Sequence, residues 1–458
     1  MKSNYGGLIS GVALALACVS AGAGQPLSFA DAMDRLESDS HVLEAARLEL
    51  AQAQAELAQA RGRRLPTVSL EGRLTRLDSP LGVDLSGALP GLGAVLPPGL
   101  LPDRFEIQSE QFYKLAVEAR MPLYTGGRVA AGIAAGEAGA EAGESALAAA
   151  RAQLHELLVQ RYFGLVLASE AVQVRSATVA GLSRHLADAV RLEEEGLIAR
   201  AERLRANVAL AEAERELRTA EERQTLAGAA LAALLAMREV PQASTPVPPA
   251  PAMPSLAALI EQAKLTNPTL AELRSRQTQA DAGARAERGS FLPTLGAFGR
   301  RELYTADLTL LDPEWAVGLV AEWTLFDGFQ RRARFDQATA RADRVAALRA
   351  DAERQIELLV RQRHEQLLTA LGRLDSFSAT RELAEESLRV QQRAFEEGLA
   401  SSLDVIDAEL SLSRVRLGEL DARLQAWSAL AGLYAASGQT ALLPERIAAQ
   451  LSRAHNSL

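Results

Sequence analysis

The chain has 458 residues, of which 48% are hydrophobic, 23% charged and only 4% aromatic, and its formal net charge is −9. This acidic balance, without any basic run, argues against a nucleic-acid-binding protein. The single cysteine excludes an internal disulfide, and the abundance of alanine, leucine, arginine and glutamate is typical of long helices and not of thick globular cores.

Residues 1–23 have the pattern of a secretory signal peptide. Lys2 supplies the positive start, Leu8–Val19 an apolar run too short to span a bilayer, and Ala21-Gly-Ala23 a small-residue cleavage site. No other segment offers about 18 uninterrupted apolar residues, so we expect no transmembrane helix. Cys18 follows a faint lipoprotein box, and we favour its loss with the signal peptide over its acylation.

The rest of the chain contains an internal repeat. Arg120-Met-Pro-Leu-Tyr-Thr-Gly126 matches Glu322-Trp-Thr-Leu-Phe-Asp-Gly328 at an offset of 202, and Glu194-Glu-Gly-Leu197 matches Glu396-Glu-Gly-Leu399 at the same offset. Such self-similarity indicates a duplicated structural unit. We divide the chain into a first repeat at 24–240, a proline-rich linker at 241–254, a second repeat at 255–437 and a C-terminal tail at 438–458. The prolines of the linker predict an extended spacer.

Each repeat contains two stretches in which apolar and polar residues alternate, which is the period of a strand. Their bounds are about 67–77, 111–125, 294–304 and 314–326. In the third stretch the alternation is imperfect, because Arg301 falls on the apolar face and Phe298 on the polar face. Each stretch has about 10 residues, enough to cross a bilayer as a tilted strand. The insertion at about 78–109, rich in Gly, Pro and Leu, is expected to be an external loop.

Aromatic residues gather in and beside these four stretches. Trp and Tyr favour the membrane–water interface, where the ring is half solvated. We therefore predict membrane-interface positions for Tyr113, Tyr124, Trp315, Trp323 and Phe326. The alternative is a soluble β-sandwich whose aromatics form its core, but four strands in two hairpins make a poor sandwich.

Long proline-free segments follow the strand pairs, and their apolar residues recur at heptad spacing. They predict long helices at 128–236 and 329–436 that pack as coiled coils, and seventy helical residues would rise about 105 Å. Only Arg381 interrupts the apolar row that Leu158, Leu165 and their equivalents begin. The expected strand-to-helix junctions are Gly126, Gly127, Asp327 and Gly328, and the expected turns at the far tips are Gly196 and Gly398.

Four strands cannot close a sheet in a membrane, where each unpaired edge group would cost several kcal/mol. Two chains would give eight strands around an interior filled by side chains, whereas three chains would give twelve strands around water. The charged residues on the polar faces favour water. We therefore predict a homotrimer whose strands lie in lipid and whose helices continue the tube into an aqueous compartment.

No catalytic constellation is apparent, because the five histidines are scattered and nucleophilic serine motifs are absent. We expect neither an enzyme nor a metal or cofactor site. The best candidate site is the pair Asp404 and Asp407, which follows the Gly398 turn and shares one helix face. Three copies would form a ring that attracts cations. The alternative is ordinary capping, since acids in the first turn favour the helix dipole.

The duplication, together with three motifs, resembles the TolC-type outer-membrane channel family over roughly Leu27 to Gly438. The motifs are Pro122-Leu-Tyr-Thr-Gly-Gly127, Leu325-Phe-Asp-Gly328 and Glu397-Gly-Leu-Ala-Ser-Ser-Leu-Asp-Val-Ile-Asp407. The resemblance implies a mainly helical fold with a β-barrel segment: a trimeric, twelve-stranded outer-membrane barrel continued by a long periplasmic helical tunnel. It implies an exit duct for a tripartite efflux pump or type I secretion system, with a periplasmic adaptor and an inner-membrane pump as partners.

The resemblance also implies residues at the periplasmic entrance. Asp404 and Asp407 match an aspartate pair that lines this entrance, and Glu202 matches the facing aspartate of the first repeat. Ala400 and Phe395 stand where the family's closed-state latch has an arginine and a tyrosine, so that latch cannot form here. The alternative function is a soluble periplasmic coiled-coil adaptor, in which the alternating, aromatic-rich hairpins would have no place.

Overall fold

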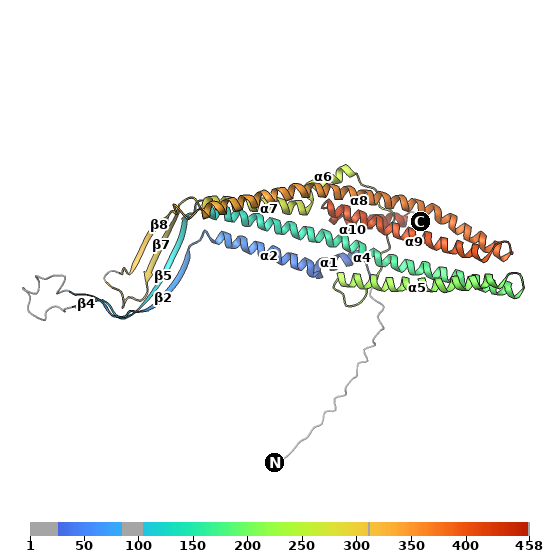
Figure 1. The fold of residues 1–458 in the computed structure, drawn as a ribbon, viewed down its shortest axis with the longest axis horizontal. Coiled ribbons are helices and arrows are strands. Elements are labelled where there is room, and N and C mark those ends of the chain that lie inside the picture. Colours follow the sequence, from blue (N-terminus) through green and yellow to red (C-terminus); the bar gives the residue numbers. More distant parts are fainter. Residues whose placement is uncertain (1–25, 85–103, 310–311, 457–458) are drawn as a thin grey trace, which may run out of the picture.

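The computed structural model describes residues 26–84, 104–309 and 312–456. The molecule is elongated, with a sheet at one end and helices that run from it to the other end (Figure 1). The predicted signal peptide, with Cys18, and residues 85–103 of the predicted external loop lie outside the described residues. Within the described ranges, no helix combines the length and the hydropathy needed to cross a membrane.

The two repeats follow the same order of elements: a short helix, a longer helix, two strands, a very long helix and a return helix. The first repeat has α1 (Phe29–Asp39), α2 (His41–Gly62), β2 (Thr67–Arg76), β5 (Gln111–Tyr124), α4 (Arg128–Glu194) and α5 (Arg200–Leu234). The second has α6 (Leu256–Thr266), α7 (Pro268–Gly289), β7 (Thr294–Glu302), β8 (Trp315–Glu322), α8 (Gln330–Glu396) and α9 (Ser402–Ala436). Strand β8 ends four residues before the bound that the sequence pattern suggested, so Trp323 and Phe326 lie just beyond it.

The four long strands form one antiparallel sheet in the order β2-β5-β7-β8. The central pair joins the repeats, because β5 of the first repeat pairs with β7 of the second. Strands β2 and β8 are the outer strands, and among the described residues each is paired on one side only. The sheet is therefore open, with a hydrogen-bonding edge on either side.

The sheet has one apolar and one polar face. The register places Leu70, Val117, Arg301 and Trp315 on the same face, and it places Glu118, Arg300 and Glu71 on the other. Arg301 therefore lies on the apolar face and Phe298 on the polar face, as the imperfect alternation in this strand predicted. Exposed side chains on the apolar face include Val68, Leu70, Leu74, Val317 and Leu319.

The expectation of a loop throughout 78–109 was wrong at its two ends. Leu81–Asp84 forms β3 and Arg104–Gln108 forms β4, and the two strands pair in an antiparallel way. The backbone N–H of Leu77 donates to the Glu110 carbonyl at 2.7 Å, which carries the pairing of β2 and β5 on towards β3 and β4. The hairpin thus extends beyond the four-stranded sheet, because neighbouring backbone groups satisfy one another where the strands leave it.

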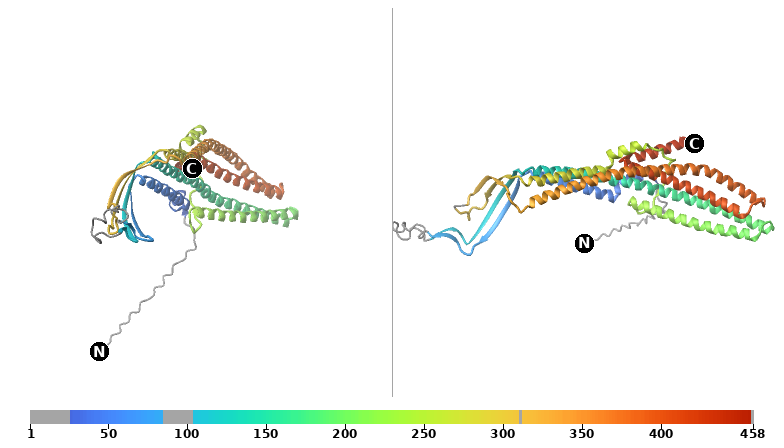
Figure 2. Two further views of the ribbon diagram at one scale, coloured as in Figure 1. Left: turned by 60° about the vertical axis from the view of Figure 1, so that its left-hand side comes forward. Right: turned by 45° about the horizontal axis from the view of Figure 1, so that its top comes forward.

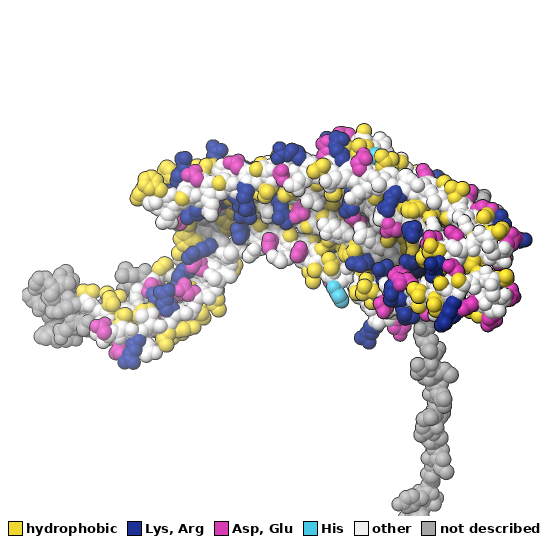
Figure 3. All heavy atoms as spheres, turned by 45° about the vertical axis from the view of Figure 1, so that its right-hand side comes forward, with side chains coloured by type: hydrophobic (Ala, Val, Ile, Leu, Met, Phe, Trp, Pro, Cys, Tyr) yellow, Lys and Arg dark blue, Asp and Glu magenta, His cyan; other side chains and the backbone are white. Residues whose placement is uncertain are grey.

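The helices form a layer that continues the order of the strands. Next to the sheet, α2 packs on α4, α4 on α7 and α7 on α8. Towards the far end, α5 packs on α4, α4 on α9 and α9 on α8 (Figures 1 and 2). At Arg381, where the heptad row is interrupted, the guanidinium pairs with Glu419 on α9 at 3.2 Å. Charged side chains of both signs are spread along the helices (Figure 3).

The largest core lies midway along the helices and includes the predicted linker and tail. Gln242–Ala243 forms β6, which pairs in parallel with β1 (Pro26–Leu27), and Val247 is buried. The indole N–H of Trp427 donates to the carbonyls of Pro248 and Pro249 at 3.0 and 3.2 Å. The segment 241–254 thus links the repeats with an extended backbone, and the sequence pattern did not predict that it packs into the core.

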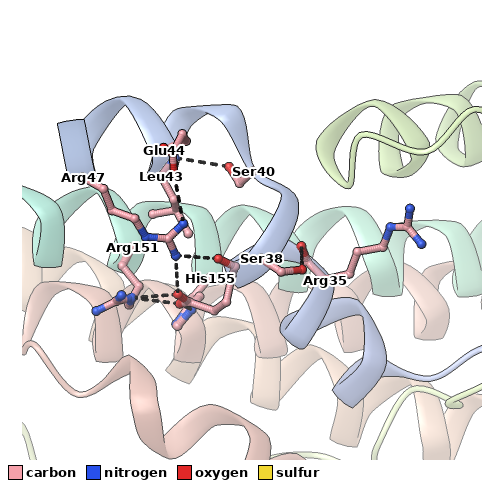
Figure 4. A network of polar contacts seen from close by, with 9 residues as sticks. Arg35, Ser38, Ser40, Leu43, Glu44, Arg47, Arg151 and His155 are labelled. Atoms are coloured by element: carbon pink, nitrogen blue, oxygen red, sulfur yellow. Dashed lines mark hydrogen bonds and ion pairs between the residues drawn. The ribbon is translucent and has the colours of Figure 1, made fainter.

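The tail is also ordered against this core. Leu443–Asn456 forms α10, and the side chains of Leu443 and Ile447 are buried. A polar network near the same level holds α1 on α4 (Figure 4): Glu37 accepts from Arg151 Nε at 2.9 Å and lies 2.8 Å from His155 Nε2. Burial lowers the pKa of His155 against the opposing effect of Glu37, so the imidazole is neutral near pH 7.

Candidate functional site

The strand-to-helix junctions lie where the sequence placed glycine beside a polar residue. Gly126 and Gly127 have φ of 64° and 81°, and Gly328 has φ of 67°. These are left-handed conformations that glycine adopts without steric cost. In the second repeat, the Asp327 carboxylate accepts from the Arg331 backbone N–H at 3.0 Å and from its guanidinium at 3.1 Å. The carboxylate satisfies a free N–H group at the start of α8.

Gly126 is required for close approach as well as for its φ, and we predict that Gly126→Ala is far more damaging than Gly127→Ala. A Cβ at Gly126 would lie 2.4 Å from the Gly289 carbonyl oxygen, whereas a Cβ at Gly127 would meet no atom within 4 Å. In both variants, placing alanine in the left-handed conformation costs the same free energy of about 1–2 kcal/mol. Thermal unfolding of the two purified variants should show a clearly lower midpoint for Gly126→Ala, and equal midpoints would contradict the assignment.

The predicted interface aromatics occupy two levels of the sheet. Tyr113 and Trp315 lie towards the end of the sheet farther from the helices, where Tyr113 also packs against Tyr304 with ring centroids 5.6 Å apart. Tyr124, Trp323 and Phe326 lie towards the helices, and the Trp323 indole N–H donates to the Phe291 carbonyl at 3.1 Å. All five side chains are exposed in the single chain.

The two long hairpins end together at the far end of the molecule (Figure 1). Gly196 and Gly398, with φ of 76° and 74°, make the turns. Small apolar cores tie the hairpins together there: Phe395 of α8 and Val405 of α9 pack against Ala189 and Leu192 of α4 and Ala206 of α5. Phe395, which stands where the resembled family's latch has a tyrosine, is therefore a buried core residue here.

The start of α9 is capped from both repeats. The Asp404 carboxylate accepts from Ser401 N at 2.8 Å and from Ser401 Oγ at 2.7 Å, which forms a capping box with this serine. These hydrogen bonds hold the pKa of Asp404 below its usual range. Glu202 of α5 accepts from the Ser402 backbone N–H at 3.1 Å and pairs with Arg205 at 2.6 Å. Two carboxylates thus face the positive end of the α9 dipole.

His185 of α4 completes this junction, and the sequence reasoning missed it. Its Nε2 lies 2.7 Å from Ser402 Oγ, and its ring lies against Phe395 with centroids 4.6 Å apart. The side chain is buried, and burial lowers its pKa despite the opposing effects of Asp188 and Glu202. No sequence signal could have found this contact, because 217 residues separate the two partners.

We predict that the tip loses stability as the pH falls through the ordinary histidine range. The unfolded imidazole titrates near 6.5, whereas the folded one binds its proton only at lower pH. Stability from His185 is therefore complete above about pH 6.5 and is lost below it, because the unfolded state binds more protons. His185→Gln, which can hydrogen-bond to Ser402 without titrating, should show a shallower decline between pH 7 and pH 5 in thermal unfolding. Parallel pH curves for the two proteins would exclude this role.

Of the three acids predicted at the tip, the structure brings Glu202 and Asp404 together at the start of α9 and leaves Asp407 apart. Asp407 is exposed and, among the described residues, has no hydrogen-bond or ion-pair partner. In the part of the chain that the structure describes, no group of three or more His, Cys, Asp or Glu side chains could hold a metal ion.

Comparisons with known proteins agree with this geometry. The family model for outer membrane efflux proteins matches residues 32–237 and 259–439. No curated protein sequence matches the chain. Among solved structures, the open state of the MtrE outer membrane channel of Neisseria gonorrhoeae is similar, with a TM-score of 0.74, 20% identity and coverage of 90% of this chain and 88% of that one.

Two further channels have the same fold. VceC of Vibrio cholerae aligns with a TM-score of 0.72 and 18% identity over 90% of this chain and 96% of that one. CmeC of Campylobacter jejuni aligns with a TM-score of 0.73 and 15% identity over 92% of this chain and 89% of that one. These matches confirm the predicted fold class, and nothing in them supports the soluble adaptor. Since the family model covers both repeats, the chain belongs to the outer membrane efflux protein family.

Proposed function

We propose that three copies of this outer-membrane efflux channel close into one tube, the exit duct through which a tripartite pump or type I secretion system moves solutes out of the cell. The observation that carries the proposal is the open sheet, with its apolar face and with β2 and β8 edges that no other described segment pairs with. In lipid such edges must be paired. Pairing β8 of one copy with β2 of the next gives three times four strands, a barrel of twelve.

The helices support the same closure. Next to the sheet the outer members of the layer are α2 and α8, and at the tip they are α5 and α8. The free side of α8 can therefore continue along its whole length against α2 and α5 of a neighbouring copy. Exposed leucines on these helices, Leu48 of α2, Leu204 of α5 and Leu348 and Leu383 of α8, are suited to such contacts.

The aromatics fit the two surfaces of a membrane. Trp315 and Trp323, the latter one residue beyond β8, are eight residues apart, about 26 Å along an extended backbone. At the tilt of about 35–45° of barrel strands this is roughly 20 Å along the membrane normal, so both rings would lie near the borders of the apolar band, which is about 25 Å tall. Leu319, midway between the two tryptophans on the same face, is 75% exposed in the single chain. The apolar face would therefore lie against lipid and the polar face would line the tube.

Channel activity tests the assembly directly. We expect the protein to fractionate with outer membranes, to cross-link to three times the monomer mass in mild detergent, and to conduct ions in planar bilayers. A monomer that stays in solution and forms no channels would overturn the proposal.

The tips are the surface that we assign to the periplasmic adaptor and, through it, to the inner-membrane pump. Leu197 and Leu399, next to the two glycine turns, are 66% and 79% exposed. Exposed apolar side chains at the end of a polar rod mark a contact surface. Cross-linking in intact cells through Cys introduced at Leu399 should capture an adaptor, with Cys at Val208 on the side of α5 as the control position.

Asp407 is the residue that we place at the entrance of the tube, and Asp404 has a second role as the α9 cap. Three Asp407 carboxylates around a narrow opening would favour cations. Asp407→Asn should therefore lower the cation-to-anion permeability ratio in bilayer recordings and leave thermal stability unchanged. Asp404→Asn should in addition lower stability, because it weakens the capping box. Wild-type selectivity in Asp407→Asn would leave Asp407 as a surface residue only.

A further inference from the structure

An arginine-rich groove lies between α4, α7 and α8, in the part of the helical layer next to the sheet. Its cavity of about 650 Å³ is lined by four arginines and only one acid: Arg276, Arg334, Arg341, Arg344 and Glu287. The chain as a whole carries a net charge of −9, so this local excess of basic side chains is opposite in sign to the net charge of the protein.

Two of the four guanidinium groups are already engaged. Arg276 pairs with Glu272 at 2.5 Å, and Arg334 lies 3.5 Å from Glu287. Arg341 and Arg344, by contrast, are exposed and have no hydrogen-bond or ion-pair partner among the described residues. These two side chains are therefore free to bind an added anion, and the engaged pair gives the groove a fixed basic wall.

The groove opens on the same side as the polar face of the sheet. Arg128, at the start of α4, lines a hollow on that face together with Glu118 and Arg120. Ala135, which follows Arg128 by seven residues, lines the arginine groove. Residues seven apart lie about 20° apart around a helix, so both point to the same side of α4. If the polar face lines the tube, the arginine groove does as well.

We propose that this groove binds organic anions in transit, with Arg341 and Arg344 as the principal contacts and carboxylate or phosphate groups as the chemistry recognised. The inference rests on the proposed assembly, in which the polar side faces the channel. Guanidinium groups bind such oxyanions through paired N–H donors. Three copies would place these grooves around one level of the tube, and a lumen lined by one sign of charge concentrates ions of the other sign.

A second groove supplies a matched control. It lies between α2 and α4, where Ile133 and Glu137 of α4 line it together with Arg61 and Arg64. Ile133 is two residues from Ala135, about 200° around the helix, so this groove opens on the opposite side of α4. The variant Arg61→Gln/Arg64→Gln removes the same charge as Arg341→Gln/Arg344→Gln but from the face that we place outside the tube, where Arg61 pairs with Glu137 at 3.0 Å.

Block of single-channel current tests the proposal, with tripolyphosphate as the phosphate probe and citrate as the carboxylate probe. In the wild type both anions should reduce the current. In Arg341→Gln/Arg344→Gln the half-blocking concentration should rise about tenfold or more and anion permeability should fall, whereas the control variant should match the wild type. Loss of block by one probe alone would identify the anion class that the groove accepts.

Three outcomes would overturn the inference, and each differs from failure of the proposed assembly. Unchanged block in Arg341→Gln/Arg344→Gln would show that the arginines do not bind the anions. An equal change in the control variant would show a general charge effect. Unchanged block with a lower melting temperature of the trimer would show that acidic groups of the adjacent copy pair with the arginines. A wild-type protein that forms no channel at all would instead refute the assembly.

Discussion

Leu319→Arg is expected to prevent or severely weaken assembly of the barrel in the outer membrane. Leu319 lies midway along β8 on the apolar face, and its side chain is 75% exposed in the single chain. An arginine facing lipid at the bilayer midplane costs about 2–4 kcal/mol. Every copy in the proposed trimer would carry that cost. The measurement is the amount of heat-resistant oligomer recovered from outer membranes, which should fall several-fold or disappear.

The neighbouring residue is the matched control. Val320 pairs with Gly296 in the register and lines the hollow on the polar face with Glu118 and Arg120. Val320→Arg should therefore assemble nearly as well as the wild type, because its charge would face water. If Val320→Arg fails and Leu319→Arg assembles, the two faces have been assigned the wrong way round. Equal behaviour of the two variants would argue against a lipid-facing sheet.

Trp427→Ala is expected to cost about 3–5 kcal/mol of stability, the range for loss of a fully buried large aromatic side chain. The Trp427 side chain has no exposed surface and lies beside Phe163, with ring centroids 6.4 Å apart. It also holds the linker through its bonds to Pro248 and Pro249. Thermal or denaturant unfolding of the purified protein measures the loss, and proteolysis within 241–254 should accelerate in parallel.

Trp427→Phe separates the two contributions of the indole. The phenyl ring keeps most of the packing but cannot donate to the Pro248 carbonyl, so the expected loss is about 1–3 kcal/mol. The linker should become more sensitive to protease in this variant too. Stability equal to the wild type in Trp427→Phe would mean that the linker is not held by this hydrogen bond. A loss as large as that of Trp427→Ala would mean that ring shape and the hydrogen bond cannot be separated.

The two faces of the sheet could be predicted from the sequence, because alternation of apolar and polar residues reflects the geometry of a strand. A residue on a strand faces one side or the other, so Leu70, Val117 and Trp315 could be assigned to one face without coordinates. Even the exceptions, Arg301 and Phe298, lie where the period of two places them. The end of β8 was less predictable, since the pairing partner β7 begins only at Thr294 and leaves Trp323 nothing to pair with.

The packing of the linker and the short strands β3 and β4 were not predicted, for a common reason. Proline content describes the local backbone, and the 241–254 segment is indeed extended, but nothing local encodes a Trp427 that lies 179 residues after Pro248. Likewise, the short strands β3 and β4 are held by each other rather than by strong alternation of their own. In both cases long-range or cross-strand contacts override the local preference.

Local patterns in the chain were enough to predict the duplication, the strand and helix periods and the glycines at the junctions and tips, because these patterns recur at a constant offset of 202 residues. The resemblance to the efflux family came from the motifs beside those glycines. Which side chains meet depends on how the elements pack in three dimensions. At the tip, Glu202 and His185 contact Ser402 although 200 and 217 residues separate them from it in the chain. The Asp404 carboxylate accepts hydrogen bonds from Ser401 in the α9 cap. Next to the sheet, the rotation of α4 decides that the arginine groove opens on the polar side. A one-dimensional pattern gives the face of each helix but not its neighbour, because packing partners are chosen by the geometry of the whole layer.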